Sequence, residues 1–327
     1  MSGVRARALP GGGLLVEVNG RRIALDPREE VRADITFVSH AHADHLPRAS
    51  PESEVIATQE TARLADVRGI RLRRVRDGKG GLELVSTGHI LGSAGLLIDG
   101  VIYYTGDISG RPRGFMPGPE PVRCGTLITE STYGRPEYRF PPHPELVGEL
   151  QRFLAEQYNE GRPALLVGYP LGKSQLLQHL IRGWRPLVSF ESVEAYSRVY
   201  REFGVELPEP DALVRRPEDL LGLRGPAVVL APSSQLGALL RVAERVGAGV
   251  AWFSGWAVRR RLPGARGFAL SDHADYGELL GFAASTGAEE VLTVHGFPED
   301  LARSLVRMGI NARPLSESAG LYDFAPG

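Results

Sequence analysis

Residues 39–45 read Ser-His-Ala-His-Ala-Asp-His and place three imidazoles and one carboxylate in a single short loop. The residues just before them, 35–38, read Ile-Thr-Phe-Val and have the β-branched and aromatic content of a buried strand. The polar loop therefore begins where a strand is expected to end. Functional sites are often built at such positions, and the small alanines leave room for close approach of the backbone.

The order of ligand types in this loop predicts two metal positions. Alternate residues diverge from a strand-to-loop turn, so His40 and His42 are expected at one ion, and Asp44 and His45 at a second. Neutral imidazole with carboxylate suits zinc, with manganese or iron as alternatives. A solvated histidine-rich loop or a single weak metal site is the competing interpretation. Three histidines and an aspartate so close together argue against it.

Composition sets the class of protein. The chain has 327 residues, 43% of them hydrophobic and 24% charged, with a formal net charge of −1, which is typical of a globular protein with room for two domains. Its single cysteine, Cys124, excludes an internal disulfide and a cysteine-cluster metal site. No apolar run has transmembrane length and the N-terminus leads into no signal-peptide core, so a cytoplasmic protein without a membrane partner is expected. Two arginine clusters, 71–76 and 259–261, fit either a positive groove or a solvated face.

Several further strand-like segments also end in a histidine or an acidic residue. The predicted strands are 35–38, 82–86, 101–104, 126–129, 268–270 and 290–294. The polar groups that follow them are the 40–45 loop, His89, Asp107, Glu130, His273 and His295. If these strand ends share one edge of a sheet sandwich, their side chains converge on one site.

Two histidines and one further aspartate lie outside these strand-end motifs. His143, in a predicted loop, and His179, in a predicted helix, are given structural roles. Asp26 closes the predicted strand 21–25 and either orients a ligand histidine as a hydrogen-bond acceptor or starts a turn.

In this order, the motifs resemble those of β-CASP nucleases of the metallo-β-lactamase fold, which include messenger-RNA 3′-end processing endonucleases, ribonuclease J and several DNA-repair nucleases. The matching segments, which span nearly the whole chain, are 40–45, 88–93, 104–107, 130–134, 271–275 and 294–296. The resemblance implies an α/β protein: an αββα sandwich with a smaller inserted α/β domain. The expected parts are residues 1–143 and 257–327 for the sandwich and 144–256 for the β-CASP insertion.

The inserted segment supports this organisation independently. Its predicted helices are 145–158 and 174–181, and its predicted strands are 164–169, 187–190, 227–230 and 250–253. Strands that alternate with helices favour a mostly parallel sheet.

The resemblance also implies roles for individual residues. One metal would be held by His40, His42 and His89, the other by Asp44, His45 and His295, with Asp107 bridging. The expected cofactor is a pair of Zn²⁺ ions, with Mn²⁺ as a substitute.

Catalysis and substrate contacts follow from the same resemblance. His273 is expected to protonate the leaving oxygen, with Glu130 accepting a hydrogen bond from its other ring nitrogen and Asp44 completing the catalytic set. Candidate substrate contacts are Tyr133, Ser93, Lys173 and Trp256, together with Tyr169. Core or interdomain packing explains the aromatic members equally well.

The implied activity is hydrolysis of single-stranded nucleic acid. An RNA-processing nuclease is preferred, because a histidine at the position of His295 accompanies RNA-acting members of the family. The alternative is a ligase-associated DNA 3′-exonuclease, which residues 253–256 and 267–275 resemble most. A hydrolase of a small thioester or lactam would not need Glu130 and His273, and an inactive nucleic-acid-binding scaffold would usually lack ligands. The expected partner is single-stranded RNA or DNA, and a homodimer is left open.

Overall fold

The computed structural model describes residues 4–315 and 322–324. The chain is an α/β protein that divides into two compact units. Unit 1 comprises Met1–Pro112, Gly118–Pro136 and His273–Gly327, and unit 2 comprises Arg113–Pro117 and Glu137–Asp272.

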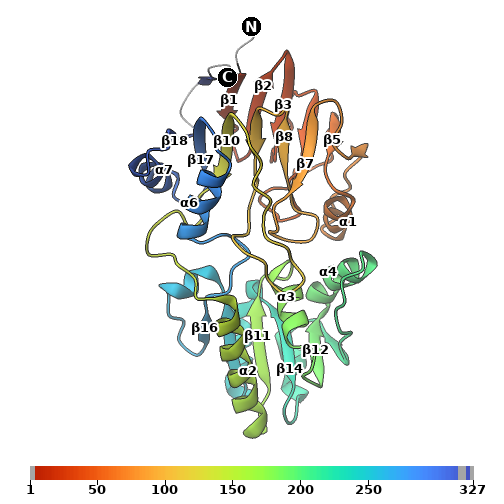
Figure 1. The fold of residues 1–327 in the computed structure, drawn as a ribbon. Helices are drawn as coiled ribbons and strands as arrows, with labels where there is room; N and C mark the ends of the chain where they lie inside the picture. Colours follow the sequence, from red (N-terminus) through yellow and green to blue (C-terminus); the bar gives the residue numbers. More distant parts are fainter. Residues whose placement is uncertain (1–3, 316–321, 325–327) are drawn as a thin grey trace. The chain divides into compact units, whose positions relative to one another are not determined.

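Unit 1 contains two β-sheets, one of seven strands and one of six within the described residues (Figure 1). The first sheet, in spatial order, consists of β19 (Tyr322–Phe324), β1 (Val4–Ala8), β2 (Leu14–Val18), β3 (Arg21–Leu25), β4 (Ile35–Phe37), β5 (Glu54–Ile56) and β6 (Val75–Arg76). The second consists of β18 (Ala312–Pro314), β17 (Glu290–Val294), β10 (Thr126–Glu130), β9 (Ile102–Tyr104), β8 (Ala94–Ile98) and β7 (Leu82–Ser86). Both sheets mix parallel and antiparallel pairs.

The period-two pattern of the strands determines how these sheets pack. Along β2, Leu14 and Val16 join a buried cluster that also contains Leu96 of β8, whereas Leu15 faces the other way. The two sheets therefore bury one face each against the other. On the far side of the second sheet, Tyr103 packs with Phe282 of α6 (Tyr276–Ser285).

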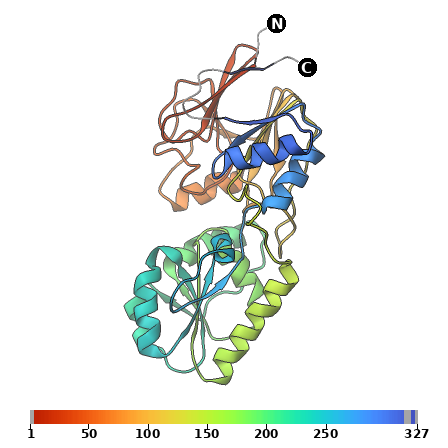
Figure 2. The ribbon, with the colours of Figure 1, turned by 90° about the vertical axis from the view of Figure 1, so that its left-hand side faces the viewer.

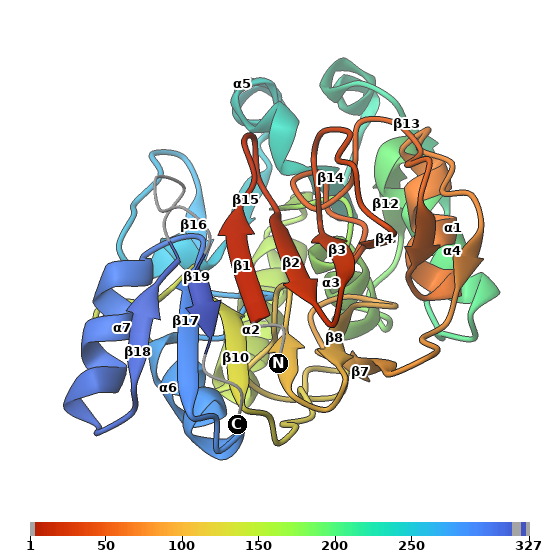
Figure 3. The same ribbon diagram turned by 90° about the horizontal axis from the view of Figure 1, so that it is seen from above.

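Helices cover the flanks of unit 1. Figure 3 shows α1 (Gln59–Val67) at one flank and α7 (Pro298–Arg307) at the opposite one. The start of α1 agrees with its sequence signal, because the Thr58 side chain accepts a hydrogen bond from the Thr61 backbone N–H as an N-cap.

Unit 2 is built on a single sheet in which all the described strand pairs are parallel. In spatial order its strands are β13 (Ala212–Val214), β12 (Leu187–Phe190), β14 (Val228–Pro232), β11 (Ala164–Gly168), β15 (Gly249–Phe253) and β16 (Arg266–Phe268). Its helices are α2 (His143–Asn159), α3 (Lys173–Leu180), α4 (Glu191–Glu202) and α5 (Leu236–Val246). Figure 2 shows α2 and α5 on opposite sides of this sheet.

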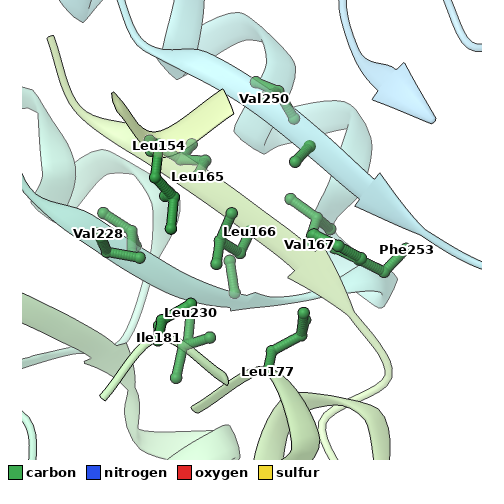
Figure 4. Packing of buried hydrophobic residues seen from close by; sticks show 14 of the residues in the cluster. Leu154, Leu165, Leu166, Val167, Leu177, Ile181, Val228, Leu230, Val250 and Phe253 are labelled. Atoms are coloured by element: carbon green, nitrogen blue, oxygen red, sulfur yellow. The ribbon is translucent and has the colours of Figure 1, made fainter. Parts of the chain in front are cut away.

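The core of unit 2 explains why its strands read as continuous apolar runs. Leu165, Leu166 and Val167 of β11 are all fully buried, because helices cover both faces of the sheet (Figure 4). Leu177 and Ile181 pack against this strand layer from α3 and its C-cap.

Two boundaries differ from the sequence predictions. Unit 2 extends beyond the predicted 144–256 range, since β16 pairs in parallel with β15 and draws residues up to Phe268 into its sheet. The strand predicted at 268–270 is in fact β16 and ends at Phe268, so a short loop separates it from His273.

The predicted loop around His143 is also wrong. This residue begins α2, because Pro144 lies in the first turn, where its fixed φ and missing N–H favour helix initiation. In residues 4–315 and 322–324, no helix combines the length and apolar character needed to cross a membrane.

Candidate metal centre

Four of the predicted ligands form one compact cluster in unit 1. His40 and His42 follow β4, His89 follows β7, and Asp107 follows β9. One side-chain ligand atom from each of these residues lies within 4.8 Å of those of the others. Strand ends that are far apart in sequence therefore converge, and the cluster has the composition and spacing to hold a metal ion.

Asp107 lies at the centre of this arrangement and is buried. Its Oδ2 is 3.4 Å from His40 Nε2 and 3.6 Å from His89 Nε2. Its Oδ1 lies 3.4 Å from His45 Nε2. The two carboxylate oxygens thus face two different histidine groups.

The partner of His40 Nδ1 sets the tautomer of this ring. Ser39 Oγ donates to Asp26, so it accepts from His40 Nδ1, 2.9 Å away. When the His40 ring is neutral, its Nε2 then presents a lone pair to the Asp107 carboxylate. His45 is held from both sides by acids, because its Nδ1 lies 2.7 Å from Asp26 Oδ2 and donates to it, and its Nε2 lies 3.4 Å from Asp107 Oδ1.

A buried nitrogen lone pair that faces a carboxylate oxygen has no hydrogen-bond donor opposite it. A cation between the two acceptors would satisfy both. Among the described residues, His40 Nε2 is fully buried and has no hydrogen-bond partner. Two imidazole nitrogens and a carboxylate form a donor set that suits a divalent transition metal. The residues present therefore fit a metal ion at this position.

Asp26 orients two of these ligands from behind. Its carboxylate accepts from the backbone N–H and the hydroxyl of Ser39 at 2.7 and 2.6 Å, from the Tyr104 hydroxyl at 2.8 Å, and from His45. This is the ligand-orienting geometry that the sequence left open for Asp26. Sequence reasoning missed Ser39 and Tyr104, although each directly adjoins a motif that carries ligands.

A glycine permits this close packing. Gly106 has φ +58°, and a Cβ there would lie 2.6 Å from the Ser39 side chain. Glycine is therefore required where the Asp107 loop crosses the His40 loop.

In the metal-free protein, the electrostatics of the cluster reflect its mixture of buried acids and imidazoles. Burial alone would raise the pKa of Asp107, but His45 and His273 nearby bring this pKa well below its usual value. Burial would lower the pKa of His45, but Asp107 and Asp26 raise it well above its ordinary range. Burial, reinforced by His273 and His40, holds the pKa of His89 well below normal, which keeps this ring neutral and able to bind a metal.

The remaining predicted ligands are placed less tightly. The His45 and His295 rings are neighbours, with centroids 5.6 Å apart. Asp44 and His295 are exposed, and neither belongs to a described group whose ligand atoms all lie within 4.8 Å of one another. The structure thus brings His295 beside the cluster without assembling the second predicted ligand set to the same closeness.

Glu130 and His273 form a pair next to the cluster. Glu130 is fully buried, and its two oxygens lie 3.1 and 3.0 Å from His273 Nδ1. The backbone N–H groups of Ile108 and Thr132 donate to the same carboxylate and fix its position. His273 Nδ1 is also 3.8 Å from Asp107 Oδ2, so these three residues form a second possible metal-binding group.

The two members of this pair differ in exposure. The His273 side chain is 21% exposed whereas Glu130 is fully buried, so Glu130 holds a ring that reaches the surface of unit 1. Asp275 in the same motif caps α6 by accepting from the Glu278 N–H, so its role is structural.

Two predicted substrate contacts have other partners in the structure. Ser93 is buried, and its hydroxyl accepts from the N–H groups of His89 and Ile90, which orders the ligand-bearing turn. Lys173 differs from its prediction as a phosphate contact: it is buried in unit 2, and its ammonium lies 2.8 Å from Asp272 Oδ2. The buried Asp272 carboxylate needs this positive partner.

The aromatic candidates fall into different environments. Tyr133 is buried with its ring 6.0 Å from that of His273, whereas Tyr169 is 58% exposed. Trp256 is half-buried and meets Tyr138 edge to face, with centroids 5.2 Å apart.

Comparisons with known proteins relate this chain to part of a longer protein. The chain is 34% identical over 310 residues to a protein from Opitutus terrae named a probable DNA ligase, a match that covers 86% of this chain. The chain spans only 29% of that protein's length. No family model matches the chain.

A solved structure has a similar fold. A protein of unknown function from Enterococcus faecalis V583 superimposes with a TM-score of 0.68, covering 99% of this chain and all of the other. The two sequences are 16% identical, so this likeness concerns the fold.

Proposed function

We propose that the chain is a metal-dependent nuclease that cleaves single-stranded DNA, and that it is a β-CASP protein of the metallo-β-lactamase fold. In this proposal, the two packed sheets of unit 1 with their outer helices are the αββα sandwich, and unit 2 is the inserted domain. The order of the ligand motifs along the chain supports the same assignment.

The position of Asp107 carries the proposal. One carboxylate oxygen faces His40 and His89, and the other faces His45, so Asp107 would belong to both predicted ligand sets. His42 would complete the first ligand set, and Asp44 and His295 the second. Two divalent cations, Zn²⁺ or Mn²⁺, would supply water activation and neutralise charge on a phosphoryl group.

The residues of the chain provide the proton transfer. His273 holds its Nδ1 proton toward Glu130, which stabilises the imidazolium form and fixes the ring. The Nε2 proton is then available to the leaving oxygen of a cleaved phosphodiester. Backbone donors from Ile108 and Thr132 keep the carboxylate of Glu130 in place during this transfer.

The choice of DNA rests on the ligase similarity. Sequence alone preferred RNA, because of the histidine at His295. A protein named a probable DNA ligase contains a region like most of this chain, and this favours the alternative, trimming of DNA ends in association with ligation. Hydrolysis of a phosphodiester is the chemistry that such a metal centre suits.

Matched single-stranded DNA and RNA, labelled at either end, test the proposal with protein loaded with zinc or manganese. We expect DNA to be shortened from its 3′ end. The Asp44→Ala, His45→Ala double variant serves as the control and should cleave neither strand.

Other outcomes would redirect the assignment. Preferential RNA cleavage would make the chain an RNA-processing nuclease. Intact strands with metal-loaded protein would contradict nuclease activity and favour hydrolysis of a small thioester or lactam.

A further inference from the structure

A basic segment beside the metal centre is not used by the chemistry proposed above. Residues 63–79 contain seven basic and two acidic side chains, in a chain whose net charge is −1. The segment runs from α1 through β6 and three residues beyond it, and β6 is the edge strand of the first sheet of unit 1. Its charge is therefore a local concentration.

Five basic side chains of this segment form a surface that we call the basic strip: Arg71, Arg73, Arg74, Arg76 and Lys79. All five are exposed. Arg76 pairs with Glu54 at 2.8 Å, on a surface where such a pair is readily exchanged. Within the part of the chain that the structure describes, the first three arginines have no ion-pair partner.

The backbone under the strip holds one of its arginines in an uncommon conformation. Leu72 is the buried anchor of the segment, whereas Arg74 adopts φ +52°. The left-handed region is unfavourable for an arginine and easy for a glycine. The Arg74 carbonyl accepts a hydrogen bond from the Val55 N–H, whereas its exposed side chain makes no ion pair within the described residues.

The strip is fixed to the metal centre at two points. At the start of α1, the hydroxyls of Thr58 and Thr61 donate to Gly92 O at 2.7 and 3.0 Å, in the turn that carries His89. Gly92 has φ +75°, and a Cβ there would lie 2.5 Å from Glu60, so the helix and the turn are in close contact.

The second attachment lies at the end of α1. Arg68, the C-cap residue, donates from Nε to Ala41 O at 2.8 Å, inside the loop that carries His40 and His42. The basic strip begins three residues later. Both attachments join it to loops that bear ligands, all within unit 1.

We propose that the basic strip is a binding surface for the phosphate backbone of the nucleic-acid strand whose end is at the metal centre. Exposed guanidinium groups contact phosphates without reading sequence, which suits an enzyme that acts on strands of any sequence. The inference rests on the proposed function, because it assigns the substrate of that site a path along α1 and β6.

A triple variant, Arg71→Gln, Arg73→Gln, Arg74→Gln, tests the strip. We expect the Kd for an oligothymidine strand to rise by at least about tenfold, because contacts to phosphate dominate affinity for nucleic acids. The slope of log Kd against log salt should fall by about 2, at roughly 0.7 for each lost contact to a single strand. Binding is measured on the His273→Gln background with metal present, so that cleavage of the strand is slow during the measurement.

Two controls distinguish the effect of positive charge on the basic strip from the effect of positive charge elsewhere on the protein. The corresponding triple lysine variant keeps the positive charges and should retain the salt slope. Arg303→Gln with Arg307→Gln removes charge from α7, on the opposite flank of unit 1, and should change neither quantity (Figure 3).

Cleavage of a thymidine dinucleotide, on the otherwise unaltered enzyme, distinguishes this inference from the proposed function. The triple glutamine variant should cut the dinucleotide as the unaltered protein does, because the inference assigns the strip to phosphates beyond the two nucleotides at the metal centre. Unchanged strand affinity in that variant, or equal losses in the lysine variant, would overturn the inference. If the unaltered protein cuts neither substrate, the proposed nuclease function fails, while the binding assay still decides whether the strip holds nucleic acid.

Discussion

Each unit of this protein has a buried group of charged and polar side chains, and the two groups are built in opposite ways. In unit 2, the Asp272 carboxylate meets Lys173 Nζ at 2.8 Å, and Arg113 NH1 lies 3.4 Å from its other oxygen. In unit 1, the Asp107 carboxylate instead faces the nitrogens of His40, His45 and His89 at 3.4 to 3.6 Å.

The two groups differ in the source of the positive charge that balances the buried carboxylate. The carboxylate of Asp272 has its cations within the chain, so that group is complete and structural. At Asp107, the Nε2 lone pair of neutral His40 faces a carboxylate oxygen, because the Nδ1 proton of this ring is directed to Ser39. Burial of uncompensated acceptors is costly, and an external cation removes this cost.

Removal of the central carboxylate of unit 1 should have the largest effect on activity. We expect Asp107→Ala to lose metal and to lower turnover by at least about 10⁴-fold, since several kcal/mol of transition-state stabilisation depends on the metal. Bound metal is measured by elemental analysis and turnover with end-labelled DNA. Retention of stoichiometric metal would show that Asp107 is no ligand.

Substitution of His273 tests whether this residue is a metal ligand or lies outside the ligand set. We expect His273→Gln to keep its metal and to lower turnover by about 10²- to 10⁴-fold, the usual contribution of a general acid. Glu130→Gln, which removes the acceptor behind Nδ1, should act in the same direction with metal retained. Loss of metal from His273→Gln would instead assign this histidine as a ligand, in line with its 3.8 Å approach to Asp107.

The buried pair of unit 2 should respond in stability. We expect Lys173→Met to lower the free energy of unfolding by about 3–5 kcal/mol, because it leaves Asp272 buried with one positive partner fewer. Urea denaturation measures this change. Lys173→Met combined with Asp272→Leu should recover part of the loss, since no lone charge then remains buried.

The Lys173→Met variant also tests whether the charged group of unit 2 is independent of the metal cluster of unit 1. Metal content per folded molecule should stay unchanged in Lys173→Met. A fall in metal content at full folding would mean that the pair of unit 2 takes part in metal binding, contrary to the comparison above.

Local chemistry explains what the sequence could predict. The ligand cluster was predicted because each of its residues directly follows an apolar, β-branched segment, and strand ends share a sheet edge. The start of α1 depends on a signal of the same local kind, because the Thr58 side chain accepts a hydrogen bond from the Thr61 N–H three residues later. Both signals lie within a few residues of the feature that they predict.

Contacts between residues far apart in the sequence could not be predicted from the sequence. Tyr104 donates to Asp26, 78 residues away, and Lys173 to Asp272, 99 residues away. A single tyrosine or lysine in the sequence does not indicate such a distant partner. For this reason the sequence predicts Lys173 as a substrate contact. The end of β16 at Phe268 depends likewise on its register with β15, which the apolar run 268–270 does not reveal.

The smallest expected effect concerns Ser39, which links the ligand cluster to its support. Its hydroxyl donates to Asp26 and accepts from His40 Nδ1, so it sets the tautomer that exposes the Nε2 lone pair. We expect Ser39→Ala to weaken metal affinity by about 10- to 100-fold, the usual cost of losing a group that orients a ligand. Competition with a chromophoric chelator measures this affinity.

Tyr104→Phe is the matched control for Ser39→Ala, because it also removes one donor to Asp26 but leaves both ligand rings with their partners. Its effect on metal affinity should be smaller. Equal losses in the two variants would mean that the charge balance at Asp26 governs metal binding. Loss confined to Ser39→Ala would identify the tautomer of His40 as the feature that makes the cluster of unit 1 a metal site, whereas the charge group of unit 2 is already complete.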